Sequence, residues 1–106
     1  ALRGVTVRRC VDGALYVENP GGGVVEIDDC TFEDNTSAFD GFEGAAMMTY
    51  GPGRVAIRDS RFVNNTLPGA GTSGGAVSVH LGVTTVAGGA TIATTLDVDR
   101  CVFERN

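Results

Sequence analysis

The stretch Val25-Glu26-Ile27-Asp28-Asp29-Cys30 decides the fold, because versions of it recur along the 106-residue chain at uneven spacing. Each version has alternating apolar residues, then two charged residues, then a cysteine or serine. The other versions span residues 5–10, 55–60 and 96–101, and three of the four continue into Phe-x-x-Asn, at 32–35, 62–65 and 103–106. A short strand that recurs with no helix between its copies is typical of a solenoid, in which each repeat contacts only its neighbours.

A second unit, Gly13-Ala14-Leu15-Tyr16-Val17, matches residues 44–48 and 75–79. Each coil of the solenoid is therefore expected to hold three short strands, which in the second coil are residues 25–27, 30–32 and 45–50. The coils lengthen along the chain, from 20 residues between Cys10 and Cys30 to 41 between Ser60 and Cys101. Such a stack tolerates longer turns, because each doubling of loop length adds only about 0.6 kcal/mol to the entropic cost of closing the loop.

The period-two alternation predicts which side chains face the interior. Val25 and Ile27 are expected to point inward and Glu26 outward, as in a half-buried strand. Stacking the coils about 4.8 Å apart then aligns like residues in columns. The expected columns are Val7/Ile27/Ile57/Val98, Cys10/Cys30/Ser60/Cys101, an aromatic stack of Phe32/Phe62/Phe103, and corner asparagines Asn35/Asn65/Asn106 in a left-handed backbone.

These repeats resemble the right-handed parallel β-helix over essentially the whole chain. Alternating Gly-Gly-Ala-Val (residues 74–77) and Phe-x-x-Asn units are similar to the polymorphic outer-membrane protein repeat of large surface proteins, although only this copy has the complete Gly-Gly-Ala-Val. The resemblance implies an all-β solenoid of about three and a half coils. Residues 1–106 are expected to form a single segment of a longer chain.

Residues 82–95 are predicted to form a hairpin that projects from the solenoid, because Val/Thr runs flank Gly88-Gly89. Two interpretations stay open for it, a surface that contacts a partner and a tolerated insertion.

The charge pattern predicts ion pairs between coils. The net charge is −5, and the eight cationic side chains are all arginine. Stacked bends would form one column Arg8/Asp28/Arg58/Asp99 and a second column Arg9/Asp29/Asp59/Arg100. Exposed pairs of this kind contribute about 0–1 kcal/mol each, so their clearer effect is on register. No basic stripe is present, so nucleic acid is not an expected partner.

The acidic residues raise the rival hypothesis of an enzyme. Asp28, Asp29, Asp59, Asp97 and Asp99 resemble the acidic clusters of polysaccharide-cleaving β-helix enzymes, where carboxylates act as acid and base or bind calcium. Arginine in the adjacent coil would lower the carboxylate pKa and disfavour the acid role. We therefore predict no catalytic, cofactor-binding or metal-binding residue, and a solvated role for the single histidine, His80.

The cysteines and two glycosylation sequons are the remaining candidates for chemistry. Cys10 and Cys30 are expected in adjacent coils, where a disulfide and a buried ladder of free thiols with Cys101 both stay open. Asn35-Thr36-Ser37 and Asn64-Asn65-Thr66 are sequons, and Asn64 is the better acceptor because Asn35 is expected to point inward.

The sequence therefore predicts a structural or adhesive segment of a large extracellular or cell-surface protein, with function in turns 33–44 and 66–74 and in the hairpin. Expected partners are the rest of its own chain, neighbouring subunits, glycans or surface proteins. No apolar run is long enough to span a membrane. The alternative is a pectate-lyase-like, carbohydrate-active β-helix enzyme.

Overall fold

The computed structural model describes residues 1–19, 21–37, 45–68, 75–81, 83–85 and 91–106. In these ranges the chain is all-β, with strands in three sheets and no helix. It follows that the described ranges contain no helix that is long and apolar enough to cross a membrane.

Each sheet takes one strand from successive repeats of the chain. Sheet 1 has the order β1 (Leu2–Arg3), β4 (Val24–Asp28), β7 (Gly53–Arg58), β11 (Thr91–Asp99) and β10 (Val83–Thr85). Sheet 2 has the order β12 (Val102–Glu104), β8 (Arg61–Val63), β5 (Thr31–Glu33) and β2 (Thr6–Arg8). Sheet 3 has the order β3 (Leu15–Glu18), β6 (Met47–Gly51) and β9 (Val77–Leu81).

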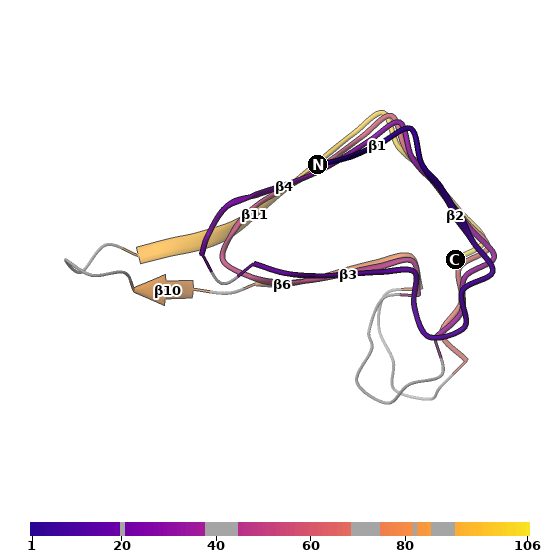
Figure 1. The fold of residues 1–106 in the computed structure, drawn as a ribbon, viewed down its shortest axis with the longest axis horizontal. Helices are drawn as coiled ribbons and strands as arrows, with labels where there is room; N and C mark the ends of the chain where they lie inside the picture. The colour runs from indigo at the N-terminus through magenta and orange to yellow at the C-terminus, as the bar shows by residue number, and fades with distance from the viewer. Residues whose placement is uncertain (20, 38–44, 69–74, 82, 86–90) are drawn as a thin grey trace.

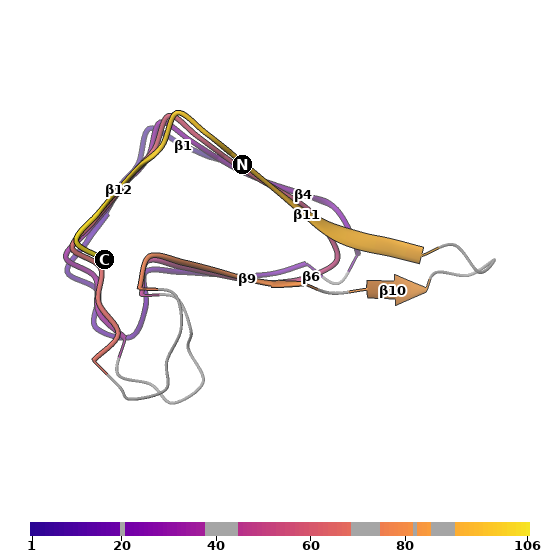
Figure 2. The same cartoon turned by 180° about the vertical axis from the view of Figure 1, so that it is seen from behind.

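Successive repeats lie on top of one another along the direction of view in Figure 1. The three sheets follow three sides of a roughly triangular outline, and the reverse view in Figure 2 shows the same arrangement. All pairings between repeats are parallel within the described residues, and β10 pairs with β11 in antiparallel fashion. Three strands per repeat, as the sequence predicts, are confirmed by this order.

The interior is a set of columns of like side chains. Ile27 pairs with Ile57 in sheet 1, and Phe32 pairs with Phe62 in sheet 2. All four are at most 2% exposed. The ring of Phe62 stacks on that of Phe32 at 5.0 Å between centroids and on that of Phe103 at 4.9 Å. The predicted aromatic stack is therefore confirmed.

An asparagine ladder closes the end of sheet 2. The side-chain nitrogen of Asn35 donates to the Oδ1 of Asn65 at 2.9 Å, and that of Asn65 donates to the Oδ1 of Asn106 at 2.9 Å. Asn65 also donates to the backbone oxygen of Phe32 at 3.1 Å. Buried amides of this kind are stable only because both ends of each amide are paired.

The first repeat is in a different register from the one that the sequence predicts. Leu2, not Val7, pairs with Ile27, and Val7 pairs with Phe32. The reason is a left-handed bend at Gly4, whose φ of 59° matches the 51° of Asp29 one repeat later. Residues 8–10 resemble 28–30 in sequence but belong to the bend after sheet 2.

Two left-handed bends recur in each repeat. One column, between sheets 1 and 2, comprises Gly4, Asp29, Asp59 and Arg100, and the other, after sheet 2, comprises Arg9, Asp34, Asn64 and Arg105. The prediction that Asn35, Asn65 and Asn106 themselves adopt the left-handed conformation is wrong, because the residue before each of them does so. That bend turns the following asparagine inward, where its amide joins the ladder.

Two further predictions have clear outcomes. Leu15 pairs with Met47, so Ala45, not Gly44, stands in the place of Gly13. The antiparallel pairing predicted within residues 82–95 is confirmed for β10 and the start of β11, which extend beyond the triangular outline in both views. Residues 82 and 86–90, including the predicted Gly88-Gly89 turn, lie outside the described residues.

Candidate functional site

The bends between sheets 1 and 2 bring charged residues of successive repeats together. Arg3 pairs with Asp28, Asp28 with Arg58, and Arg58 with Asp99, so the sign alternates at every step. The predicted alternation is thus present with Arg3 in place of Arg8. Arg8 instead lies opposite Glu33 in sheet 2, with 3.7 Å between Nη1 and Oε1.

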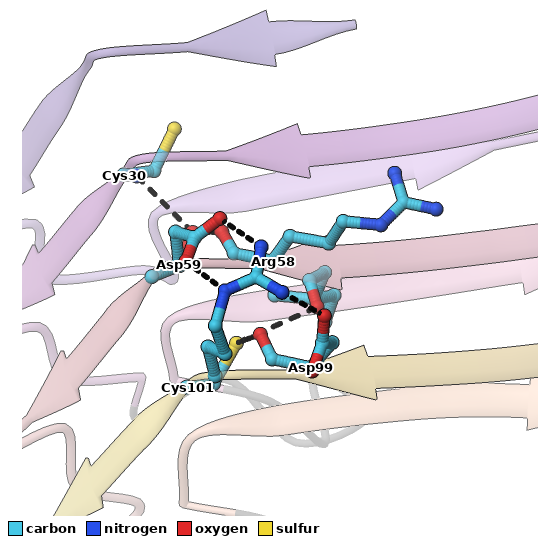
Figure 3. Close-up of polar contacts among 8 residues, drawn as sticks. Cys30, Arg58, Asp59, Asp99 and Cys101 are labelled. Carbon is cyan, nitrogen blue, oxygen red and sulfur yellow. Dashed lines mark hydrogen bonds and ion pairs between the residues drawn. The ribbon is translucent and has the colours of Figure 1, made fainter.

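Arg100 binds two carboxylates at the bends between sheets 1 and 2, those of Asp59 and Asp99. Its Nε and Nη2 donate to the two carboxylate oxygens of Asp59, each at 2.6 Å, and its Nη1 contacts Asp99. Figure 3 shows Asp59 and Asp99 on neighbouring repeats on either side of one guanidinium group. The hydrogen bond from Arg100 holds the pKa of Asp59 below its ordinary value, and the same bond raises the pKa of Arg100. A carboxyl group with a lowered pKa is a poor general acid.

Two other arginines form ion pairs with aspartates of a neighbouring repeat. Arg54 Nε lies 2.7 Å from Asp97 Oδ2, and Arg3 Nε lies 3.5 Å from Asp28 Oδ2. The Arg54–Asp97 pair was not predicted, although both residues stand in the repeated strand and face the same side. Asp28, Asp59, Asp97 and Asp99 therefore have arginine partners. Within the described ranges no group of three or more His, Cys, Asp or Glu residues could hold a metal ion.

The cysteine and serine column has a structural role at the same bend. Ser60 Oγ donates to the backbone oxygen of Arg58 at 2.6 Å and accepts a bond from the backbone nitrogen of Cys30 at 3.1 Å. Cys30 Sγ and Cys101 Sγ each lie 3.2 Å from the backbone oxygen two residues earlier. Figure 3 shows the contact of the Cys101 sulfur. A small side chain with a donor closes the bend in the second, third and fourth repeats, where cysteine and serine alternate, whereas Val5 takes this position in the first repeat.

Cys10 does not belong to this column, which corrects the predicted thiol ladder. Because of the register in the first repeat, Cys10 takes the place of Asn35 one repeat earlier, and its backbone nitrogen donates to Asn35 Oδ1 at 3.1 Å. All three cysteines are free thiols. The disulfide between Cys10 and Cys30 is therefore not formed, because the two residues are not neighbours in one column.

The two sequons differ in accessibility. Asn35 is fully buried and its amide nitrogen is engaged in the ladder, so it cannot receive a glycan in the folded chain. Asn64 is exposed, and its amide nitrogen donates to Asp34 Oδ1 at 2.7 Å. Glycosylation of Asn64 stays a prediction. The side chain of His80 and the turn residues 38–44 and 69–74 lie outside the described residues.

Two hollows open where the sheets end. We call the edge formed by β1, β2 and β3 the N-terminal end face, and the edge formed by β9, β11 and β12 the C-terminal end face. The hollow of the C-terminal end face has a volume of about 440 Å³ and is lined by Ile57, Val77, Val79, Leu96, Val98 and Phe103. That of the N-terminal end face, about 340 Å³, includes Leu2, Leu15, Val17 and Val25. Sequence reasoning did not predict these hollows as binding surfaces.

No family model, no curated protein and no solved structure matches this chain.

Proposed function

We propose that this chain is a segment of a right-handed parallel β-helix of about three and a half coils, with a structural or adhesive role in a large extracellular or cell-surface protein. The main observation in support is that repeats of different length and sequence stack with their strands in register. Side chains in the columns are used to join one repeat to the next, as in the asparagine ladder and the phenylalanine stack.

Several features support a scaffold rather than a reactive site. The strands keep their register while the connections between them differ in length, so the stack tolerates variation in turns 33–44 and 66–74 and in the hairpin near 82–95. These turns and the hairpin are the proposed contact regions for glycans or surface proteins. Asn64 is exposed and is the proposed glycosylation site, which a cell-surface location would allow.

The alternative is a segment of a polysaccharide-cleaving β-helix enzyme, which the row of acidic residues at the bends favours. General acid–base catalysis needs a carboxyl group whose pKa lies near the working pH. Asp59 has a lowered pKa because Arg100 binds both of its oxygens. The scaffold role is therefore the better supported of the two.

A binding and turnover assay separates these functions. The chain would be incubated with a panel of acidic and neutral plant and algal polysaccharides, and both retention on the polysaccharide and release of sugar ends would be measured. We expect no turnover. Turnover that disappears when Asp28, Asp29 and Asp59 are changed to Asn, with the far-UV circular dichroism unchanged, would establish the enzyme instead.

A further inference from the structure

We propose that the outer face of sheet 3 binds an arginine-bearing segment of a partner protein, with Tyr16, Glu18 and Tyr50 as the contact residues. This adds a partner surface to the scaffold role proposed above. Sheet 3 forms the side of the triangular outline opposite the corner where sheets 1 and 2 meet (Figure 1). Its outer face is therefore separate from the paired charges at the bends between sheets 1 and 2.

The alternation of side chains along the strands of sheet 3 defines its outer face. Met47 belongs to the core, and Leu15 packs against it. Their neighbours along each strand point the other way, because successive side chains of a strand alternate between the two faces of a sheet. Tyr16 and Glu18 of β3 and Tyr50 of β6 lie on this outer face and are exposed.

Both tyrosines of the chain stand close together on this face. Glu18 lies directly opposite Tyr50 in the register, and Tyr16 is the diagonal neighbour of Tyr50. Strands about 4.8 Å apart with a rise of about 3.3 Å per residue place the Cα atoms of the two tyrosines about 8 Å apart. Tyr16 is 49% exposed and Tyr50 is 53% exposed. Tyr50 lies in the central strand, between β3 and β9, so its exposure does not depend on where the chain begins or ends.

The charge of the chain is unevenly divided between its sheets. Residues 10–19, 35–51 and 65–81, which contain the strands of sheet 3, hold four acidic residues and no arginine or lysine. The rest of the sequence holds nine acidic residues and all eight arginines. Four of the five net negative charges therefore come from the segments that contain sheet 3. Such an imbalance attracts a cationic partner and disfavours an acidic one.

The contact residues favour arginine over other cations. A guanidinium group is planar, so it stacks on an aromatic face and donates two parallel hydrogen bonds to a carboxylate. Glu18 and Tyr50 are one strand spacing apart, about 4.8 Å, so a guanidinium on the Tyr50 ring has the Glu18 carboxylate beside it. The ring of Tyr16 provides a second stacking surface for the same segment. A neutral sugar could also stack on the two rings, but it would gain nothing from the negative charge.

Removal of one ring tests the stacking. A fluorescently labelled hexa-arginine peptide would be titrated with the chain, and binding would be followed by anisotropy at about pH 8, where histidine is ordinarily neutral. We expect Tyr50→Ala to weaken binding about 2- to 30-fold, as the range for cation–π contacts implies. Tyr50→Phe keeps the ring and should keep the affinity. A hexa-lysine peptide of equal charge should bind less tightly, because an ammonium group cannot donate the bidentate pair.

A pair of matched charge variants tests the carboxylate. Glu18→Gln and Glu26→Gln each remove one negative charge, but Glu26 lies in sheet 1, in register with Ala56. We expect Glu18→Gln to weaken hexa-arginine binding about tenfold, as loss of a hydrogen bond to a charged group implies. Glu26→Gln should change the affinity little, since it alters only the net charge.

A measurement on the unmodified chain does not depend on how the variants fold. Arginine methylene protons stacked on tyrosine rings should shift upfield in the proton spectrum of the bound peptide. Nuclear Overhauser effects should connect them to the ring protons of Tyr16 and Tyr50. A peptide that binds without either signal contacts another surface, which would overturn the inference.

The remaining outcomes are equally decisive. Equal affinity of hexa-arginine for the unmodified chain and for Tyr50→Ala, equal losses in Glu18→Gln and Glu26→Gln, or equal binding of hexa-lysine would show that net charge alone attracts the peptide and would overturn the inference. Binding of cellohexaose that Tyr50→Ala abolishes, without binding of hexa-arginine, would make the face a sugar-binding surface instead. Each of these results leaves the scaffold role intact, whereas polysaccharide turnover contradicts that role and leaves the arginine-binding surface intact.

Discussion

Replacing Phe62 by alanine tests the interior columns at their centre. The ring is fully buried and stacks face to face with Phe32 and Phe103, with interplanar angles of 4° and 5°. Truncating a buried phenylalanine costs about 3–5 kcal/mol, and each lost aromatic pair accounts for roughly 0.5–1.5 kcal/mol of the interaction. We expect Phe62→Ala to lower the free energy of unfolding by about 3–5 kcal/mol.

Phe103→Ala is the matched comparison, because the same ring type stands in the same column with one stacked face. Phe103 is 47% exposed, so the loss should be about half as large, roughly 1.5–2.5 kcal/mol. Urea unfolding followed by circular dichroism measures both values under one set of conditions. A loss below about 1 kcal/mol for Phe62→Ala, or equal losses for the two variants, would refute the buried aromatic column.

Three further predictions concern the bends and the ladder. Arg58→Asp places a third carboxylate between Asp28 and Asp99, so it should destabilise the chain modestly and more at low salt. Arg61→Asp is the matched control and should show little salt dependence, because its register partners Thr31 and Val102 are uncharged. Unfolding midpoints at two ionic strengths decide this, and equal salt responses would contradict the charge column. Asn65→Ala removes the Oδ1 that accepts from the backbone and side-chain nitrogens of Asn35 and removes the donor to the backbone oxygen of Phe32, so chemical denaturation should show a loss of about 1–3 kcal/mol; a loss below about 1 kcal/mol would contradict the ladder. Because the folded pKa of Asp59 is lowered, its contribution to stability is present above its ordinary value of 3.8 and is lost as the pH falls through the folded pKa. Asp59→Asn should therefore lose less stability than the unmodified chain on acidification below 3.8, and parallel pH profiles would contradict the Arg100 contact.

The Phe-x-x-Asn units were predictable because each residue has one clear preference. Phenylalanine favours burial, and asparagine has donors and acceptors for both neighbouring repeats. The columns that these residues form, and the three strands per repeat, follow from the sequence spacing. The antiparallel pairing of β10 with β11 follows from Val/Thr runs around two glycines.

The first repeat was not predictable from residue similarity because different residues adopt the same backbone conformation. Gly4, Asp29 and Arg100 share a left-handed bend, although arginine rarely adopts it. Residues 8–10 have side chains of the same types as residues 28–30, but they belong to the bend after sheet 2. Only the backbone geometry distinguishes residues 8–10 from residues 28–30. For this reason Cys10 lies outside the cysteine column, and Arg3 takes the position that was predicted for Arg8.

The candidate site was likewise predictable only in part. The pairing of Arg100 with Asp59 in the neighbouring repeat was predictable from the charge columns, but the additional contact of Arg100 with the preceding residue, Asp99, depends on the side-chain conformation.

The stacking of repeats in the determined register is the central claim, and nuclear Overhauser effects between the aromatic rings test it most directly. With centroids 5.0 and 4.9 Å apart, the ring protons of Phe62 should give cross-peaks to those of both Phe32 and Phe103. The same spectrum should connect the side chain of Val7 to Phe32 and that of Leu2 to Ile27. Cross-peaks from Val7 to Ile27 in place of these, or the absence of contacts from Phe62 to either ring, would contradict the account.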